Sequence, residues 1–320
     1  MNPSHSATKS PVSLCPLCED SAFTCLDVFP AGDLQIEYAR QLGVDIRGEF
    51  APDVQTFELR ECENCHLQYF FPLCTGSPAF YARLSDQEAY YSRSRWEFDE
   101  TISSLAKSDV VVDVGCGDGH FLSLLPQEKK LGLEFNPEAV SKAHRRGLDV
   151  RCADLTSLPA ACADAVTLFQ VLEHVGEPVT LLRAAIRVLR SGGKLFVAVP
   201  NNDGFIGEVL HDPLNAPPHH VLRWTAASLC YVPRVLPLKL ERLAVEPLPQ
   251  ENLFHYRRTW ITRAVSRFRG RPIPRMRLSP GMVFLRRASN LLARVAVNLY
   301  PRMPEGVVAG HSFLAAYRKM

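Results

Sequence analysis

The sequence lacks the features of secreted, membrane-spanning or highly charged proteins. Residues 1–13 are polar, without the apolar segment of a signal peptide, and no apolar run reaches the roughly 20 residues that span a bilayer. The 36 basic and 34 acidic residues leave a net charge of only +2, so no overall attraction to polyanions is expected. We therefore expect a cytoplasmic protein with a disordered N-terminus at residues 1–13. Its 320 residues allow one large core and a small module.

Two common phosphate-binding patterns are also absent from the most glycine-rich stretch. The β-branched run at 110–114 predicts a buried strand, three glycines follow, and a helical pattern begins at His120. The glycines do not match the dinucleotide pattern G-x-G-x-x-G, and no Lys-Ser/Thr pair follows them. Asp113 and Asp118 would repel a pyrophosphate but suit a cation, such as the ammonium and sulfonium of S-adenosylmethionine (SAM). The three glycines are Gly115, Gly117 and Gly119.

The next strands predicted along the chain end in acidic residues. Residues 131–134 end in Glu134, 19 residues after Gly115, where a carboxylate can accept hydrogen bonds from both ribose hydroxyls. Residues 150–155 predict a third strand with Asp154 near its end. A fourth strand at 165–169 precedes a helix that opens at Pro178 and is predicted to end at 191–193. A fifth strand at 194–199, a sixth at 239–245 and a seventh at 312–319 complete the pattern.

Four stretches in this order resemble the class I SAM-dependent methyltransferases: 111–119, 132–134, 170–174 and 189–193. The resemblance implies an α/β fold with a doubly wound, seven-stranded Rossmann-like sheet, and SAM as cofactor. It places Asp113, Gly115 and Gly117 around the methionine moiety, with Cys116 contributing backbone. The remaining cofactor contacts that it implies are Glu134 at the ribose, Phe135, Asp154 and Leu155 at the adenine, and Phe169 and Gln170 lining the cleft.

Four of the ten cysteines form two C-x-x-C pairs. Cys15, Cys18, Cys62 and Cys65 can supply the four thiolates of a structural zinc ion, which leaves no open coordination position. Strand-like runs follow both pairs, so residues 1–75 predict a zinc-ribbon-like β module, with residues 31–53 as an insertion. This arrangement resembles the module that precedes some small-molecule and sugar methyltransferases.

Residues 76–108 predict a helical linker or lid ahead of the SAM-binding domain at 109–320. The linker is rich in aromatic residues, and Tyr90, Tyr91 and Trp96 are candidates to cover the cofactor. Packing of these helices on the sheet explains the same pattern equally well.

An acceptor-site loop is predicted at 201–225, after the fifth strand and at the edge where ligands bind in such sheets. Pro217 and Pro218 stiffen the chain ahead of two histidines. Histidine can take a proton near neutral pH, so His219 or His220 is predicted as the base or acceptor ligand, with His174 as a third candidate. A role in ordering the loop by hydrogen bonding is the competing interpretation.

A helical insertion at 250–311 carries a strong local charge. Residues 252–304 include twelve arginines and no acidic residue. An anionic membrane surface or a phosphorylated acceptor, contacted through residues 257–302, would suit this segment, and nucleic acid is the less favoured partner. An ordinary solvated basic face is the alternative.

We therefore predict a methyltransferase that moves a methyl group from SAM to an oxygen or carbon atom of a small, sugar-linked or lipid-linked metabolite. The Asn/Asp-Pro-Pro-aromatic motif of base-amino methyltransferases is missing after the fourth strand, where Phe169-Gln170-Val171-Leu172 stands. Three alternatives remain open: a zinc-containing RNA methyltransferase, a non-catalytic SAM-binding docking protein, and another adenosyl-group enzyme such as an aminopropyltransferase.

Overall fold

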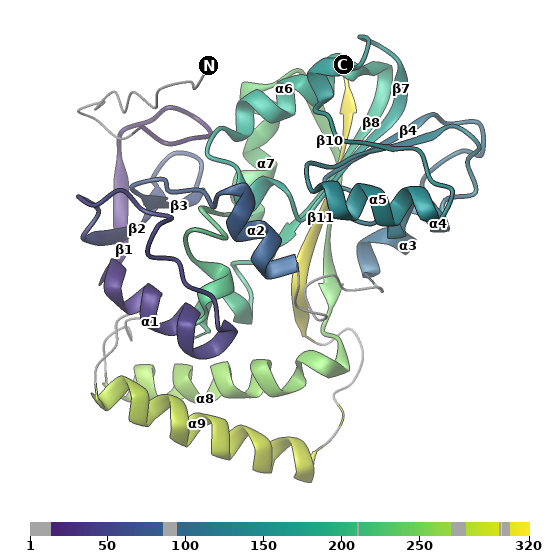
Figure 1. Cartoon of the computed structure of the whole chain (residues 1–320). Helices are drawn as coiled ribbons and strands as arrows, with labels where there is room; N and C mark the ends of the chain where they lie inside the picture. The colour runs from purple at the N-terminus through teal and green to yellow at the C-terminus, as the bar shows by residue number, and fades with distance from the viewer. Residues whose placement is uncertain (1–13, 86–94, 210, 270–279, 301, 303–307) are drawn as a thin grey trace.

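The computed structural model describes residues 14–85, 95–209, 211–269, 280–300, 302 and 308–320. Its centre is a seven-stranded α/β sheet with the strand order β10-β11-β8-β7-β4-β5-β6, which confirms the predicted sheet (Figure 1). Neighbours from β8 to β6 are parallel, whereas β11 runs antiparallel to both β8 and β10. The strands are β4 (Val111–Val114), β5 (Lys130–Leu133), β6 (Val150–Arg151), β7 (Ala163–Phe169), β8 (Leu189–Pro200), β10 (Leu238–Pro247) and β11 (Ala309–Lys319).

Apolar strands and helix caps explain why this part of the chain folds as it does. Val111, Val112 and Leu168 are at most 2% exposed, as expected for strands covered on both faces. Asn136 caps α5 by accepting the N–H of Glu138, with a proline at the first helical position. The helices packed around this sheet are α3 (Trp96–Ile102), α4 (His120–Leu124), α5 (Pro137–Arg145), α6 (Pro178–Val188) and α7 (Ala226–Val235).

Two element boundaries differ from the prediction. Helix α6 already ends at Val188, and residues 191–193 lie within β8 because Leu189 pairs with Ala163 of β7. The third strand covers only Val150–Arg151, because Asp154 caps a short 3-10 turn by accepting the N–H of Thr156.

The strand order places two loops side by side. From β4 the chain proceeds to β5 and β6 on one side, and then returns to β7 and β8 on the other. Because β4 and β7 are parallel neighbours, the loops that follow them, at 115–119 and 170–174, leave the same edge of the sheet. Such a reversal of strand order is where ligands bind in open α/β sheets.

A second, antiparallel sheet contains the N-terminal residues, in the order β1-β2-β3-β9. The strands are β1 (Phe23–Pro30), β2 (Thr56–Cys62), β3 (Gln68–Phe71) and β9 (Leu222–Arg223). Helix α1 (Ala31–Leu42) occupies the predicted insertion, and α2 (Pro78–Ser85) follows the sheet. Strand β9 comes from the predicted acceptor-site loop, so this loop is joined by backbone hydrogen bonding to the N-terminal sheet.

The basic segment forms two helices, α8 (Leu253–Arg269) and α9 (Pro280–Leu299), which lie side by side below α1 (Figure 1). Tyr90, Tyr91 and three of the predicted arginines, Arg271, Arg275 and Arg277, lie outside the described residues. Among the helices that are described, none combines the length and hydropathy needed to cross a membrane.

Candidate functional site

The glycine loop after β4 has a backbone that requires glycine. Gly115, Gly117 and Gly119 have φ values of 68°, 55° and 77°, in the left-handed region that side chains disfavour. A Cβ atom on Gly115 would also lie 2.8 Å from Cγ2 of Val171 in the neighbouring loop. The two loops therefore approach each other as closely as glycine allows.

Glu134 connects this loop to the end of β5. Its Oε2 accepts the Gly117 N–H at 2.9 Å, and its Oε1 accepts the Asn136 N–H at 2.8 Å. Each carboxylate oxygen has more than one lone pair, so both oxygens can accept further hydrogen bonds from a ligand. The predicted ribose-binding acid thus lies directly against the glycine loop.

Asp113 lies below the loop and is only 3% exposed. Thr167 Oγ1 on β7 donates a hydrogen bond to its Oδ1 at 2.6 Å, while burial raises the pKa of this carboxyl group to about 7. The charge of Arg95, directly before α3, acts on Asp113, on Glu173 and on His174.

The other predicted cofactor residues differ widely in exposure. Phe135 is 72% exposed, and Asp154 is exposed at its turn, so both are open to a ligand from solvent. Leu155 is 2% exposed within the core. Phe169 packs on Phe121 with ring centroids 4.9 Å apart.

Gln170 begins the loop that follows β7. Its φ of 56° is unusual for a side chain other than glycine, asparagine or aspartate, and its Nε2 donates to Oε1 of Glu97 at 3.2 Å. The same Glu97 oxygen lies 3.7 Å from Nη1 of Arg95. The cleft side of β7 is therefore held by a polar network that reaches the start of α3.

The three predicted histidines meet in one cluster. Adjacent ring centroids are 4.4 Å apart for His219 and His220, 4.5 Å for His174 and His219, and 4.9 Å for His174 and His220. Burial lowers the pKa of His174 to about 4 and holds those of His219 and His220 well below the usual 6.5. All three rings are therefore neutral at pH 7, and each has one protonated and one unprotonated nitrogen.

A buried acid, Glu173, completes this cluster. It is 0% exposed, and burial raises the pKa of its carboxyl group to about 8. In the sequence, Glu173 falls only within the stretch 170–174 that carries the family resemblance, and no role was predicted for it. The signal that could have drawn attention to it is its position beside His174, directly after a strand.

The four predicted zinc-binding cysteines also lie together. Sγ of Cys15 is 3.5 Å from Sγ of Cys65, and Sγ of Cys18 is 3.4 Å from Sγ of Cys62. All four sulfur atoms lie within 4.8 Å of one another. The cluster therefore has the composition and size of a structural four-cysteine zinc site.

Comparison with known proteins agrees with this geometry. Residues 112–197 match the family described as "Methyltransferase domain". The chain is 30% identical over 152 residues to a "Probable S-adenosylmethionine-dependent methyltransferase" of Mycolicibacterium smegmatis, which covers 46% of this chain and 58% of that protein. It is 35% identical over 102 residues to a "Ubiquinone biosynthesis O-methyltransferase" of Xanthomonas oryzae, covering 28% of this chain and 43% of that protein.

Among solved structures, a SAM-dependent methyltransferase from Archaeoglobus fulgidus aligns with a TM-score of 0.48 at 16% identity, over 75% of this chain and 100% of that one. The chain spans about half the length of the curated relatives it matches. Residues 112–197 thus match a methyltransferase domain, and the curated relatives that share this part of the chain are named as SAM-dependent or O-methyltransferases.

Proposed function

We propose that this protein transfers a methyl group from SAM to an oxygen or carbon atom of a small or carrier-linked metabolite. One observation carries the proposal: the glycine loop after β4 is hydrogen-bonded to Glu134 at the point where the strand order reverses. This loop would present backbone atoms to the ligand, and the carboxylate of Asp113, buried on β4 below the loop, would pair with the ligand's ammonium group. The name of the Xanthomonas relative, an O-methyltransferase, supports oxygen as the accepting atom.

Little chemical activation is needed beyond correct positioning. The sulfonium of SAM already activates the methyl group, so the protein must align the acceptor with it and accommodate the acceptor's proton. The histidine cluster lies at the end of β7, beside the glycine loop, and therefore suits the acceptor side. His174, His219 and His220 would act there by taking this proton or by holding the acceptor.

The four-cysteine cluster would bind structural zinc. Its ligands come from one end of the N-terminal sheet, since one pair precedes β1, the other lies at the turn from β2 to β3, and Phe23 at the start of β1 pairs with Cys62 at the end of β2. A bound ion would join these two turns without taking part in methyl transfer, because four thiolates leave no coordination position open.

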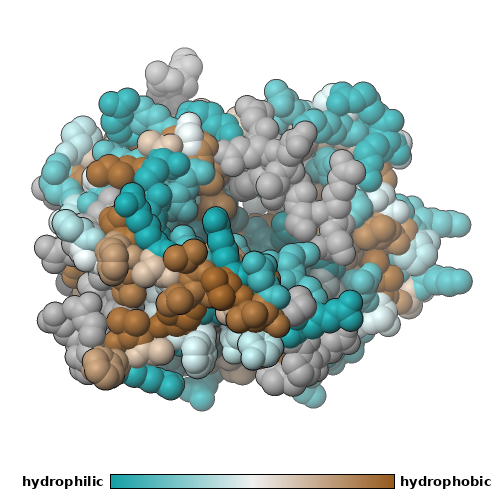
Figure 2. All heavy atoms as spheres, turned by 90° about the horizontal axis from the view of Figure 1, so that it is seen from below, coloured by the Kyte–Doolittle hydropathy of each residue, from teal (hydrophilic) through white to brown (hydrophobic). Residues whose placement is uncertain are grey.

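The exposed face of α8 and α9 favours a lipid-linked acceptor. Figure 2 shows hydrophobic side chains gathered in a band on this face, bordered by hydrophilic ones. Arg287 and Arg294 are also exposed on α9, so the band has the cationic border expected for contact with an anionic membrane surface. The exposed apolar residues are Trp260, Phe268, Phe284, Leu291, Leu292, Val295 and Leu299.

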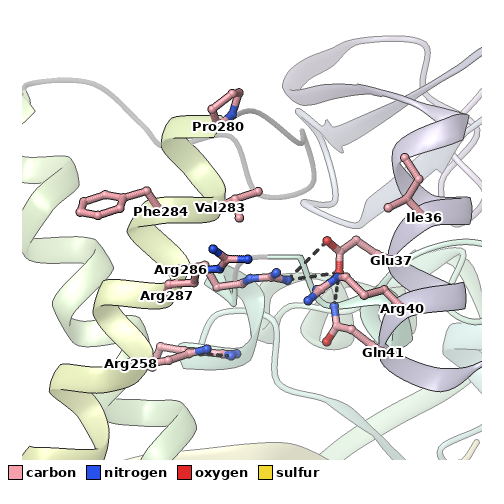
Figure 3. Close-up of a pocket in the computed structure, with 11 residues that line it drawn as sticks. Ile36, Glu37, Arg40, Gln41, Arg258, Pro280, Val283, Phe284, Arg286 and Arg287 are labelled. Atoms are coloured by element: carbon pink, nitrogen blue, oxygen red, sulfur yellow. Dashed lines mark hydrogen bonds and ion pairs between the residues drawn. The ribbon is translucent and has the colours of Figure 1, made fainter.

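A cavity next to this band is suited to a phosphate group. It has a volume of about 780 Å³ and lies between α1 and α9, with a single acid among its lining residues, Glu37 (Figure 3). Nη1 of Arg286 is 3.2 Å from Oε2 of Glu37, and Arg40 pairs with the same carboxylate. Arg258 and Arg287 add two further guanidiniums, so the cavity carries more positive than negative charge. Both features support a phosphorylated carrier at a membrane surface.

The activity is tested with labelled cofactor. Isothermal titration should show binding of SAM and of its demethylated product S-adenosylhomocysteine (SAH), and none of NAD or ATP. SAM carrying a labelled methyl group is then incubated with cell extract, which is separated into water-soluble metabolites, lipids and RNA. Label in metabolites or lipids supports the proposal, and label in RNA favours an RNA methyltransferase instead. SAH binding without any labelled product would indicate a docking protein.

The membrane contact is tested by sedimentation with vesicles of phosphatidylcholine, with and without phosphatidylglycerol. We expect binding to the anionic vesicles only, and a loss of at least tenfold for the double substitution L291Q and L299Q, since each buried leucine contributes about 1.5–3 kcal/mol. V28Q is the matched control, because Val28 is 50% exposed but lies on β1. Equal binding of both variants would contradict the assignment.

A further inference from the structure

The histidine cluster at the end of β7 has the composition of a metal site. One potential ligand atom from each of His174, His219 and His220 lies within 4.8 Å of the other two. Glu173 adds a carboxylate, whose Oε1 is 4.0 Å from Nε2 of His174 and 4.0 Å from Nε2 of His220. The donors come from two segments that are 45 residues apart, and the cluster is separate in sequence from the four cysteines.

The hydrogen bonds of the rings determine which nitrogen atoms can bind a metal. Nδ1 of His174 lies 2.7 Å from the carbonyl oxygen of His219, and Nδ1 of His219 lies 2.8 Å from that of Leu214. Since a carbonyl oxygen can only accept, both Nδ1 atoms carry the proton, and the Nε2 atoms therefore have the lone pair. In His220, Nδ1 lies 3.3 Å from Oδ1 of Asn215, which favours the same tautomer. Metal-binding histidines typically donate their second ring N–H to an oxygen atom in this way.

Glu173 provides the second, independent observation. Both its carboxylate oxygens are buried and accept no hydrogen bond from the described part of the chain. A buried carboxylate without a hydrogen-bond donor costs free energy, and Arg95, whose charge acts on Glu173, donates no hydrogen bond to it; a bound cation would satisfy these oxygens. The 4.0 Å separations are too long for hydrogen bonds. Two ligand atoms that each lie 2.0–2.1 Å from one tetrahedral zinc ion are roughly 3.3 Å apart, so a small inward shift of these side chains would bring them to metal-binding distance.

We propose that His174, His219, His220 and Glu173 bind one divalent transition-metal ion. Three imidazole nitrogens and one carboxylate oxygen suit zinc in tetrahedral geometry. The ion would join the loop after β7 to the segment around His219, where Val221 N–H already donates to the Glu173 carbonyl oxygen at 2.9 Å. A metal-bound imidazole cannot also take a proton, so in the loaded protein these three residues hold the acceptor-site segment in place instead of acting as the base.

The first test is the metal content of the purified full-length chain. Mass spectrometry should find two zinc ions per chain, one in each cluster. E173Q and H220Q should each retain one, whereas H255Q on α8, the matched histidine control, should retain both. A second probe is cobalt(II), because thiolate-bound cobalt has an intense near-ultraviolet absorption that a site of nitrogen and oxygen ligands lacks. We expect one cobalt ion to bind at the four cysteines and a second at the three histidines and Glu173.

Two results would overturn the assignment: cobalt binding with the thiolate spectrum alone, or full metal content in both E173Q and H220Q. If these variants do not fold, the cobalt spectrum of the wild-type chain still decides. SAH binding is measured on the same samples. If the chain binds SAH but no metal at the histidine cluster, only the metal site is contradicted. If it binds metal there but no SAH, only the proposed methyl transfer is contradicted.

Discussion

Replacing Glu134 with glutamine tests the cofactor site most directly. The carboxylate already accepts N–H groups from Gly117 and Asn136, and in the proposed complex it would also accept the two ribose hydroxyls. Glutamine retains one oxygen but replaces the other with an NH₂ group, which cannot accept a hydrogen bond. E134Q therefore loses one charge-assisted hydrogen bond to the ribose, without a large change in side-chain volume.

The expected loss follows from the strength of such a bond. A hydrogen bond to a charged group contributes about 1.5–3 kcal/mol, and each 1.4 kcal/mol is a factor of ten in affinity. We expect E134Q to weaken SAH binding by about 10- to 100-fold in isothermal titration. The matched control is E138Q, which removes the same charge from the exposed first turn of α5 and should change the dissociation constant less than threefold.

An SAH analogue that lacks one ribose hydroxyl separates a direct contact from an effect on the loop. If Glu134 holds the ribose, the analogue binds the wild-type chain more weakly than SAH does, and the two ligands differ little in E134Q. A change of less than threefold in E134Q, or an equal loss in E138Q, would refute the reasoning. Thermal melting of both variants checks that the fold is intact.

Three further predictions concern neighbouring groups. Since burial raises the pKa of Asp113 to about 7, and only the ionised form pairs with an ammonium group, SAH titrations should show affinity falling as pH decreases through 7 toward 5. The same raised pKa favours the protonated folded state, so Asp113 should add thermal stability to the ligand-free chain as pH falls over this range, and D113N should abolish the pH dependence of SAH affinity and remove the Asp113 share of the stability change, leaving the shares of Glu173 and the three histidines. C62S should lose zinc from the cysteine cluster and lower the melting temperature, whereas C230S should retain the metal, with metal content measured by mass spectrometry. G132A should destabilise the chain by about 1–3 kcal/mol in denaturant unfolding, because the added Cβ would lie 2.5 Å from Sγ of Cys116, and an unchanged midpoint would contradict this packing.

Local patterns were sufficient to predict the core of the fold. Some residues adopt in the fold the conformation that they prefer locally. Examples are the valine run of β4, the glycines that follow it, and Pro178 at the start of α6. Each C-x-x-C pair likewise holds its own two thiols close together, whereas the meeting of the two pairs depends on the antiparallel pairing of β1 with β2.

Contacts between distant segments were beyond the reach of the same reasoning. Strand β9 has only two residues, and it is a strand because β3 offers it a partner. Residues 191–193 read as a helix end in isolation, but pairing with β7 draws this part of the chain into β8.

The sequence by itself determined the elements with strong local signals: the parallel strands, the glycine loop and the paired cysteines. Only the tertiary structure decided that Glu173 is buried among three histidines, and that the hydrophobic side chains of α9 remain exposed. The physical reason is that burial and electrostatic environment arise from residues far apart in the chain, and helical or strand periodicity reports only on near neighbours.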